Sequence, residues 1–305
     1  MTRVLVTGGT GFVGRFIVED LLANGYAVTV ACRTPPASGL FSKPVAFLPM
    51  TLDADSDPID LFSSAYYLVH AALDHLPGRY RGGEGDDPAG FHARNLDGTA
   101  RLFEAAKDAG VRRCVFLSSR AVYGPQSGDD ALAETMPCRP DTDYGRVKLQ
   151  GERLLQALCG HGFVTASLRV TGVYGAARPG QPHKWQELFD TYRAGRDVPV
   201  RIGTEVHGRD VAAAVRLMLA ADPMRVSGES FNVADVVADT REILAPVKEE
   251  TGCPHPLPEA ARRAGARPVD TAKLRALGWQ PGGRSLFDAT LRDLVRALRA
   301  APAPA

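Results

Sequence analysis

The stretch VLVTGGTGFVG, residues 4–14, places glycine at positions 8, 11 and 14, between an apolar run and a stretch with helical spacing. Glycine here allows a tight turn and a close approach of the main chain to a pyrophosphate, and the N-terminus of the following helix offers free N–H groups. Gly14 would also let that helix pack close to the sheet. The alternative is that Gly8, Gly11 and Gly14 only form a turn that joins two elements. The strand–turn–helix context predicts a dinucleotide-binding turn.

Apolar runs alternate with helix-like stretches through the first half of the chain. The runs that we interpret as buried strands lie at 3–8, 26–33, 45–52, 65–72, 113–119 and 164–170. The stretches with helical periodicity lie at 12–25, 91–110 and 143–162. This alternation calls for parallel pairing, and strands that are apolar throughout are typical of a sheet covered on both faces. The sequence therefore predicts an α/β fold with a Rossmann-like, doubly wound parallel sheet.

The periodicity becomes weaker in the second half, which predicts a smaller lobe. We expect residues 1–175 to form the dinucleotide-binding domain, with 205–235 returning to it. Residues 176–204 and 236–305 are expected to form a small C-terminal substrate-binding lobe. Within 236–305 we expect short helices and proline-rich joints that end in a frayed tail.

Three further segments carry expectations of their own. A helix is predicted at 209–222 and a strand at 229–235. The glycine- and charge-rich stretch 76–90 has no apolar periodicity, so we expect a mobile or disordered loop there.

Composition excludes several classes of function. The 305-residue chain has a formal net charge of +1, which gives no reason to expect nucleic acid or an anionic membrane as a partner. Its five cysteines are scattered and never in C-x-x-C spacing, which argues against a disulfide framework and a metal site and fits a reducing cytoplasm. No apolar run is long enough to span a bilayer. We therefore expect a cytoplasmic protein that acts on a small molecule.

The residue that ends the second strand bears on the choice of cofactor. An acid at this place would bind the ribose hydroxyls of NAD, but the chain has Cys32 and Arg33 instead. A guanidinium suits the 2′-phosphate of NADP, and the sequence offers no neighbouring acid to repel it. Arg33 therefore favours NADP over NAD. The alternative, that Arg33 is solvated and selects neither, stays open.

The stretch DYGRVKLQGE, residues 143–152, places Tyr144 and Lys148 four residues apart. Inside a helix, positions i and i+4 lie one above the other on the same face. A single Y-x-x-x-K pattern more often marks an exposed tyrosine beside an exposed lysine. The pair alone therefore does not decide the function.

Eight segments together resemble the extended short-chain dehydrogenase/reductase superfamily, in its NAD-dependent epimerase/dehydratase group. They occur in the family's order and cover roughly residues 1–281. They are TGGTGFVG (7–14), VHAA (69–72), NLDGT (95–99), FLSSRAVYG (116–124), YGRVK (144–148), LRVTGVYG (168–175), FNVAD (231–235) and DTAKLRALGWQP (270–281).

The resemblance implies roles for particular residues. Tyr144 would be the acid/base, Lys148 would support it and hydrogen-bond the nicotinamide ribose, and Ser119 would hydrogen-bond the reacting oxygen of the substrate. The other residues that the resemblance places at the cofactor are Phe12, Val13, Leu52, Ala71, Ala72, Val170 and Val173. Asn95 is expected to hold a loop, and His70 to be packed and hydrogen-bonded rather than catalytic.

Departures from the family pattern leave the reaction open. Dehydratases carry an Asp-Glu pair where this chain has Arg120 and Ala121, so elimination of water is not expected. Epimerases usually have an asparagine at the position of Gly172 and an arginine near Gly203 that pairs with the substrate diphosphate. The candidates to replace this anchor are Lys184, Arg201 and Arg178.

Three functions follow from these observations. The first is epimerase-like hydride transfer at a hydroxyl or carbonyl carbon of a sugar or nucleotide sugar, with Arg120, Gly172, Lys184 and Arg201 towards the substrate. The second is an NADP-dependent ketone or sugar reductase or dehydrogenase with net redox turnover. The third is a nucleotide-sensing regulator without catalysis. By analogy with relatives, a homodimer through the helices at 91–109 and 143–160 is expected.

Overall fold

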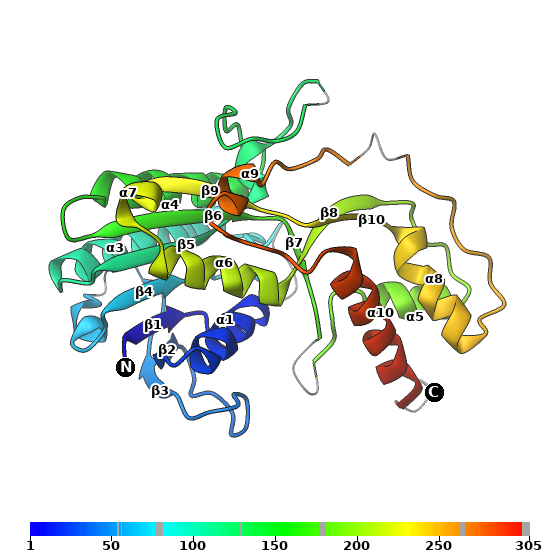
Figure 1. Cartoon of the computed structure of the whole chain (residues 1–305), viewed down its shortest axis with the longest axis horizontal. Coiled ribbons are helices and arrows are strands. Elements are labelled where there is room, and N and C mark those ends of the chain that lie inside the picture. The colour runs from blue at the N-terminus through cyan, green and yellow to red at the C-terminus, as the bar shows by residue number, and fades with distance from the viewer. Residues whose placement is uncertain are drawn as a thin grey trace.

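A seven-stranded parallel sheet forms the larger part of the molecule, and its order is β3-β2-β1-β4-β5-β6-β9 (Figure 1). The computed structural model describes residues 1–53, 55, 57–76, 82–128, 130–176, 181–262 and 266–300. The strands of the large sheet are β1 (Arg3–Thr7), β2 (Ala27–Cys32), β3 (Ala46–Pro49), β4 (Tyr67–His70), β5 (Arg113–Ser119), β6 (Val164–Val170) and β9 (Glu229–Val233). Their parallel pairing confirms the predicted Rossmann-like fold.

The strand order reverses between β1 and β4, because the chain adds β2 and β3 on one side of β1 and then crosses to the other side. In open α/β sheets the crevice at such a reversal, outside the carboxyl ends of the strands, is where ligands bind. The topology therefore locates the site at the ends of β1 and β4.

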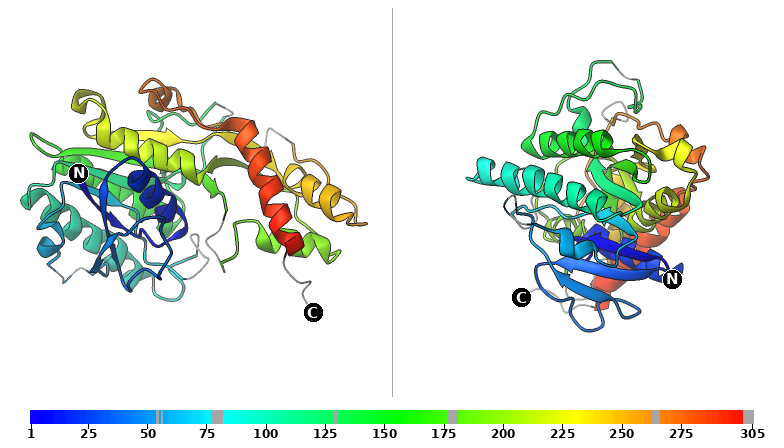
Figure 2. Two further views of the ribbon diagram at one scale, coloured as in Figure 1. Left: turned by 60° about the horizontal axis from the view of Figure 1, so that its bottom comes forward. Right: turned by 90° about the vertical axis from the view of Figure 1, so that its left-hand side faces the viewer.

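Helices cover both faces of this sheet, as the right-hand view of Figure 2 shows. Helices α1 (Phe12–Ala23) and α6 (Gly208–Ala220) pack on one face. Helices α3 (Gly98–Asp108) and α4 (Asp143–Leu158) pack on the other. Successive side chains of a strand point to opposite faces, so Val4 joins the core under α1 and Leu5 the core under α3.

A second, three-stranded sheet of order β10-β8-β7 leads into the smaller lobe. Its strands are β7 (Gly172–Tyr174), β8 (Ile202–His207) and β10 (Val236–Asp239). Helices α5 (Gln186–Arg193), α8 (Thr240–Thr251) and α10 (Gly283–Ala300) complete the lobe at the far end of the molecule (Figure 1). The remaining short elements are η1 (Ile59–Phe62), α2 (Pro88–His92), η2 (Ala93–Asp97), η3 (Arg120–Tyr123), α7 (Pro223–Val226) and α9 (Ala272–Arg275).

The expectation of only short helices after residue 236 is wrong. Helix α8 has 12 residues and α10 has 18. In α10, Phe287, Leu291, Leu294 and Val295 follow helical spacing, and all four are buried against the lobe. The helix expected at 91–110 also differs, because a π-helical turn, η2, separates α2 from α3.

Among the described residues, buried side chains form a larger cluster under α1 and α6, a second under α3 and α4, a small one beside η3 and one in the smaller lobe. The strand β9 and helix α6 belong to the larger cluster, as the return of 205–235 to the sheet requires. Leu274 and Trp279 also pack in the larger cluster, although the sequence division places 236–305 in the lobe. The domain boundaries therefore remain a prediction. Parts of the loop 76–90 and of the segment 176–204, together with the final tail, lie outside the described residues.

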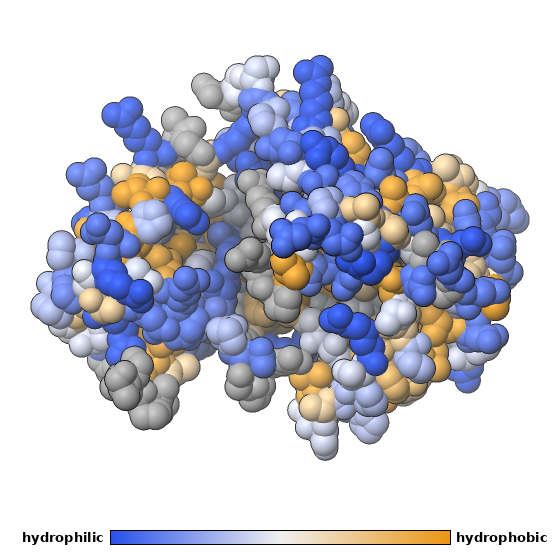
Figure 3. Space-filling view, turned by 180° about the vertical axis from the view of Figure 1, so that it is seen from behind, coloured by the Kyte–Doolittle hydropathy of each residue, from blue (hydrophilic) through white to orange (hydrophobic). Residues whose placement is uncertain are grey.

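Hydrophilic side chains predominate on the face shown in Figure 3, where apolar side chains gather in separate patches. Within the described part of the chain, no helix combines the length and the apolar character needed to cross a bilayer.

Candidate active site

The glycine turn after β1 is packed so closely that side chains are excluded from it. Gly8 has a φ of +67°, and a Cβ atom on it would lie 2.7 Å from the nitrogen of Ala72. A Cβ atom on Gly14 would lie 2.1 Å from the carbonyl oxygen of Gly8. The N-cap of α1 is Gly11, and the first turn of α1 contains no acid to oppose a bound anion. The turn therefore fits the pyrophosphate of a dinucleotide.

A cavity of about 1290 Å³ extends from this turn along the carboxyl ends of the parallel strands. Every residue predicted to bind the cofactor lines it. These are Gly8, Gly11, Phe12, Val13, Gly14, Arg33, Leu52, Ala71, Ala72, Tyr144, Lys148, Val170 and Val173. The topology accounts for this gathering, since the C-terminal ends of β1, β2, β4, β5 and β6 all meet at one edge of the sheet.

The structure brings Ser119, Tyr144 and Lys148 to the wall of the same cavity. Ser119 ends β5, and its Oγ accepts a hydrogen bond of 3.1 Å from the main-chain N–H of Ala121. Tyr144 lies in the first turn of α4 and Lys148 one turn later, so both side chains lie on one face of the helix. The side chain of Thr142 caps this helix by accepting from the N–H of Gly145 at 3.1 Å.

Lys148 is buried, with 5% of its surface exposed. Its Nζ donates to the carbonyl oxygen of Leu117 at 2.8 Å and lies 4.7 Å from the centre of the Phe116 ring. Burial lowers the pKa of Lys148 from 10.5 to about 7, and the negative charge of Glu152 opposes this change. Lys148 therefore gains or loses its proton near neutral pH.

A buried ion pair lies beneath these residues, and sequence reasoning did not find it. Arg169 Nη2 is 2.8 Å from Glu152 Oε2, and both side chains are at most 8% exposed. Glu152 also accepts a short hydrogen bond from Ser118, which precedes Ser119. The pair thus joins α4 to β5 and β6. The available signal was the i+4 spacing of Glu152 from Lys148, which places Glu152 on the face of α4 that carries Tyr144.

His70 is a packed residue rather than a reactive one, as its position at a strand end suggested. Its Nδ1 lies 2.7 Å from Thr7 Oγ1 and its Nε2 lies 3.1 Å from Thr99 Oγ1. Burial, and to a smaller extent the charge of Lys148, lower its pKa to about 3. The imidazole is therefore neutral at physiological pH.

Asn95 holds the loop after β4, as expected. Its side chain accepts from the main-chain N–H of Asp74 and donates to the carbonyl of Asp74, both at 2.7 Å.

Arg120, Gly172 and Lys184, which were predicted to face the substrate, line the same cavity. Lys184 forms a short ion pair with Glu205, whose side chain is 11% exposed. Burial raises the pKa of Glu205. A Cβ atom on Gly172 would lie 2.5 Å from Lys184 Nζ and 2.6 Å from Glu205 Oε2. A side chain at this position would therefore require the ends of the Lys184 and Glu205 side chains to shift.

Arg201 is not among the residues that line the cavity, and its role towards the substrate stays a prediction. It precedes β8, and its main chain is tied to Thr240 at the end of that strand remote from Glu205. Arg178 lies outside the described residues.

The expectation that no acid lies near Arg33 is wrong. Asp74 Oδ1 lies 3.7 Å from Arg33 Nη1. The two residues are far apart in the sequence, and only the fold brings them together. Arg33 nevertheless lines the cavity, with 76% of its side chain exposed.

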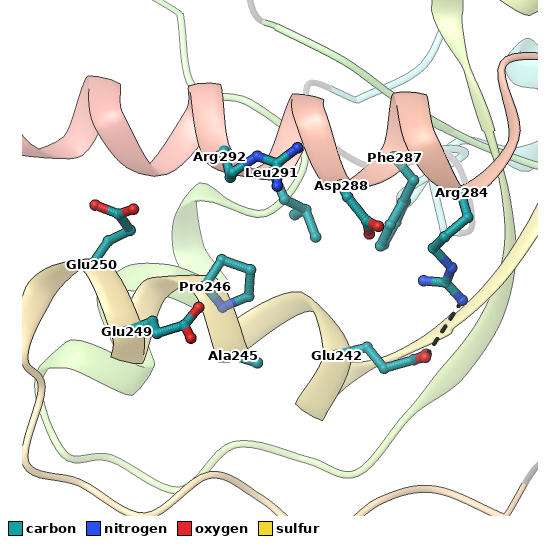
Figure 4. Close-up of a pocket in the computed structure, with 10 residues that line it drawn as sticks. All are labelled: Glu242, Ala245, Pro246, Glu249, Glu250, Arg284, Phe287, Asp288, Leu291 and Arg292. Atoms are coloured by element: carbon teal, nitrogen blue, oxygen red, sulfur yellow. Dashed lines mark hydrogen bonds and ion pairs between the residues drawn. The ribbon is translucent and has the colours of Figure 1, made fainter.

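A second hollow of about 590 Å³ lies between α8 and α10 (Figure 4). Glu242, Glu249, Glu250 and Asp288 line it, and Arg284 reaches Glu242 at 3.4 Å. None of the residues predicted to bind cofactor or substrate is among those that line it.

The model of the NAD dependent epimerase/dehydratase family matches residues 4–234, which is most of the chain. The chain belongs to this family. The resemblance read from the sequence is thereby confirmed, and the protein is an enzyme of the NAD-dependent epimerase and dehydrogenase class, of the extended short-chain dehydrogenase/reductase type.

Three relatives show how far the similarity of this family member extends. The chain is 30% identical to the dTDP-6-deoxy-L-talose 4-dehydrogenase (NAD(P)(+)) of Kitasatospora kifunensis, over 97% of its own length and 94% of the relative's. It is 29% identical to the UDP-glucose 4-epimerase of Mycolicibacterium smegmatis, over 92% and 93%. Among solved structures, the UDP-glucose 4-epimerase of Thermus thermophilus in complex with NAD is similar with a TM-score of 0.77 and 29% identity, covering 99% of this chain and 100% of that one.

Proposed function

We propose that the protein transfers hydride at a hydroxyl or carbonyl carbon of a sugar or nucleotide sugar, in the manner of a 4-epimerase. The observation that carries this proposal is the position of Ser119, Tyr144 and Lys148 on the cavity that begins at the glycine turn. Similarity to sugar-nucleotide epimerases and a dehydrogenase supports it.

Each of the three residues has a definable task. A nicotinamide dinucleotide, when bound, supplies the hydride acceptor and donor. Tyr144 exchanges a proton with the substrate hydroxyl or carbonyl. The Lys148 ammonium stabilises the phenolate form of Tyr144 when it is charged. Ser119 Oγ already accepts from Ala121, so its O–H can donate to the reacting oxygen.

The proposed cofactor is NADP or NAD, with NADP favoured by Arg33. The residues that would hold it are those that line the cavity from Gly8 to Val173. The test is the dissociation constant of NADPH and NADH for the wild type and for Arg33→Ala. Tighter binding of NADPH to the wild type, lost in the variant, is expected. Equal affinities in the wild type would overturn the preference.

The substrate would lie against Arg120, Gly172 and Lys184. Lys184 lines the cavity, whereas its ion-pair partner Glu205 is not among the lining residues. This lysine is the candidate that replaces the missing arginine anchor for a diphosphate.

A second candidate function is an NADP-dependent ketone or sugar reductase or dehydrogenase. The observation that favours it is Gly172, which stands where epimerases usually have an asparagine, beside the ion pair of Lys184 and Glu205. The experiment is to denature the purified protein, measure released dinucleotide, and then follow the absorbance of reduced nicotinamide with candidate sugars. Stoichiometric bound cofactor without net redox indicates an epimerase, and consumption of added NADPH indicates a reductase. A protein that binds dinucleotide but turns over neither class of substrate would be the non-catalytic regulator.

We further propose a cytoplasmic homodimer that pairs through α3 and α4, by analogy with relatives, and that binds neither nucleic acid nor membrane. Light scattering of the purified protein tests the assembly. A monomeric mass at micromolar concentration would contradict it.

A further inference from the structure

Asp74 faces two arginines on the wall of the cofactor cavity. Its Oδ1 lies 3.7 Å from Arg33 Nη1, and its Oδ2 accepts a hydrogen bond of 2.5 Å from Arg94 Nε. All three residues line the cavity that starts at the glycine turn. The carboxylate is therefore shared between Arg94, which lies in η2, and Arg33, which directly follows β2.

The position of Asp74 is fixed by its surroundings. The side chain of Asn95, which is 5% exposed, binds both the N–H and the carbonyl of Asp74 at 2.7 Å. Arg94 in turn lies 3.3 Å from Asp87, the residue that caps α2. Asp74 therefore presents its carboxylate from an ordered loop, whereas Arg33 is 76% exposed and can move.

The Arg33–Asp74 pair spans the place where a dinucleotide would lie. Arg33 directly follows β2 and Asp74 follows β4, and β1 lies between these two strands in the sheet. The pair thus crosses the carboxyl end of β1, where the glycine turn begins. In a fold of this kind the end of β2 is where the adenosine ribose and its 2′ substituent bind.

We propose that Asp74 determines the cofactor selectivity of this enzyme by holding Arg33 in an ion pair across the cofactor cavity. The inference rests on the proposed dinucleotide-binding function and deepens it. A 2′-phosphate carries about two negative charges and needs the guanidinium of Arg33 as its partner. The phosphate must therefore displace Asp74 from Arg33, and the unpaired Asp74 carboxylate then repels the phosphate. A 2′-hydroxyl has no charge and does not disturb the pair. Asp74 thus weakens NADP binding relative to NAD and limits the preference that Arg33 alone would give.

The test is the isosteric variant Asp74→Asn, with dissociation constants for NADPH and NADH measured by isothermal titration calorimetry. We expect the affinity for NADPH to rise about tenfold, the scale of one hydrogen bond to a charged group, and the affinity for NADH to change by less than about threefold. Asp141→Asn is the matched control, because Asp141 also lines the cavity and its replacement changes the charge by the same amount without a contact to Arg33. An equal rise in NADPH affinity in both variants would overturn the proposal, since it would show a general charge effect.

A double variant separates the bridge from simple repulsion. In the Arg33→Ala background, Asp74→Asn should lose most of its gain in NADPH affinity, because there is no Arg33 to release. An undiminished gain would overturn the proposed ion-pair bridge.

If Asp74→Asn does not fold, Arg33→Gln replaces it, since that exposed side chain can be changed without affecting the core. Its NADPH affinity should then fall by less than about tenfold, because the arginine is already engaged by Asp74. A larger fall would count against the proposal. Failure of the wild type to bind either dinucleotide would instead refute the proposed function itself.

Discussion

Lys148 Nζ donates a hydrogen bond of 2.8 Å to the carbonyl oxygen of Leu117, two residues before Ser119 on the same strand. The bond ties the helix that carries Tyr144 to the strand that carries the serine. The ammonium is buried away from water at this place, and this burial is the main cause of its low pKa.

Lys148→Met should therefore change stability in a way that depends on pH. The folded pKa of about 7 lies below the unfolded value of 10.5. Below pH 7 the lysine is charged in both states, so the wild type bears the full cost of burying the ammonium. As pH rises from 7 to 10.5, the folded protein releases its proton first and the cost disappears. We expect the variant to unfold with a free energy about 1 to 3 kcal/mol higher than the wild type at pH 6. At pH 10 we expect it about 1 kcal/mol lower, because the carbonyl of Leu117 has lost its donor.

Urea unfolding at both pH values measures this difference, and Lys43→Met is the control. Lys43 also donates to a main-chain carbonyl, that of Leu22 at 2.9 Å, but lies at the surface. Its replacement should have the same small effect at both pH values. A Lys148→Met effect that is equally independent of pH would contradict the burial argument.

Tyr144→Phe should reduce turnover by about two or more powers of ten, the scale of losing a general acid/base. The phenyl ring keeps the wall of the cavity, so the dissociation constant of the cofactor should change little. Tyr66→Phe is the control, because Tyr66 is 48% exposed and is not among the residues that line the cavity. Unchanged turnover in Tyr144→Phe would refute the proposed role.

Local pattern was sufficient for much of the fold and for the cofactor side of the site. The glycine turn, the apolar strands and the Y-x-x-x-K spacing are each contained in a few consecutive residues. Parallel pairing then brings strand ends such as Ala71 and Val170 to one edge of the sheet. This is why every predicted cofactor residue lines one cavity.

Contacts between distant segments could not be predicted in this way. Arg33 and Asp74 meet only because β2 and β4 flank β1, and Gly172 lies opposite Glu205 only through the pairing of β7 with β8. Arg201 was chosen for its nearness to a motif in sequence, but it lies four residues before Glu205, and a strand rises about 3.3 Å per residue, so Arg201 is not among the residues that line the cavity. The second sheet was missed because its strands are only 3 to 6 residues long.

Gly14→Ala should weaken dinucleotide binding by at least about tenfold, because the added methyl group would lie 2.1 Å from the carbonyl oxygen of Gly8 and must displace the turn. Stability should fall by about 1 to 3 kcal/mol for the same reason. Gly160→Ala is the matched control, since a Cβ atom there meets nothing within 4 Å. Calorimetric titration with NADPH and NADH measures binding. Normal affinity in Gly14→Ala would show that the turn is not the pyrophosphate site.

Removing one partner of the buried Glu152–Arg169 pair should lower the free energy of unfolding strongly. Removing both partners should lower it by less than the sum of the two single changes. Glu152→Leu leaves the Arg169 guanidinium charged and without its carboxylate, and we expect a loss of about 3 to 5 kcal/mol in the free energy of unfolding. Arg169→Met should cost a similar amount. The double variant should cost clearly less than the sum, because neither charge is then left uncompensated.

Glu229→Leu and Lys273→Met form the control cycle at the surface, where opposite charges lie 2.6 Å apart with side chains 50% and 34% exposed. Their coupling should stay below about 1 kcal/mol. If the effects of the two single changes on the free energy of unfolding simply added in the double variant, water would have to reach Glu152. The contact between α4 and the strand of Ser119 would then contribute little to stability.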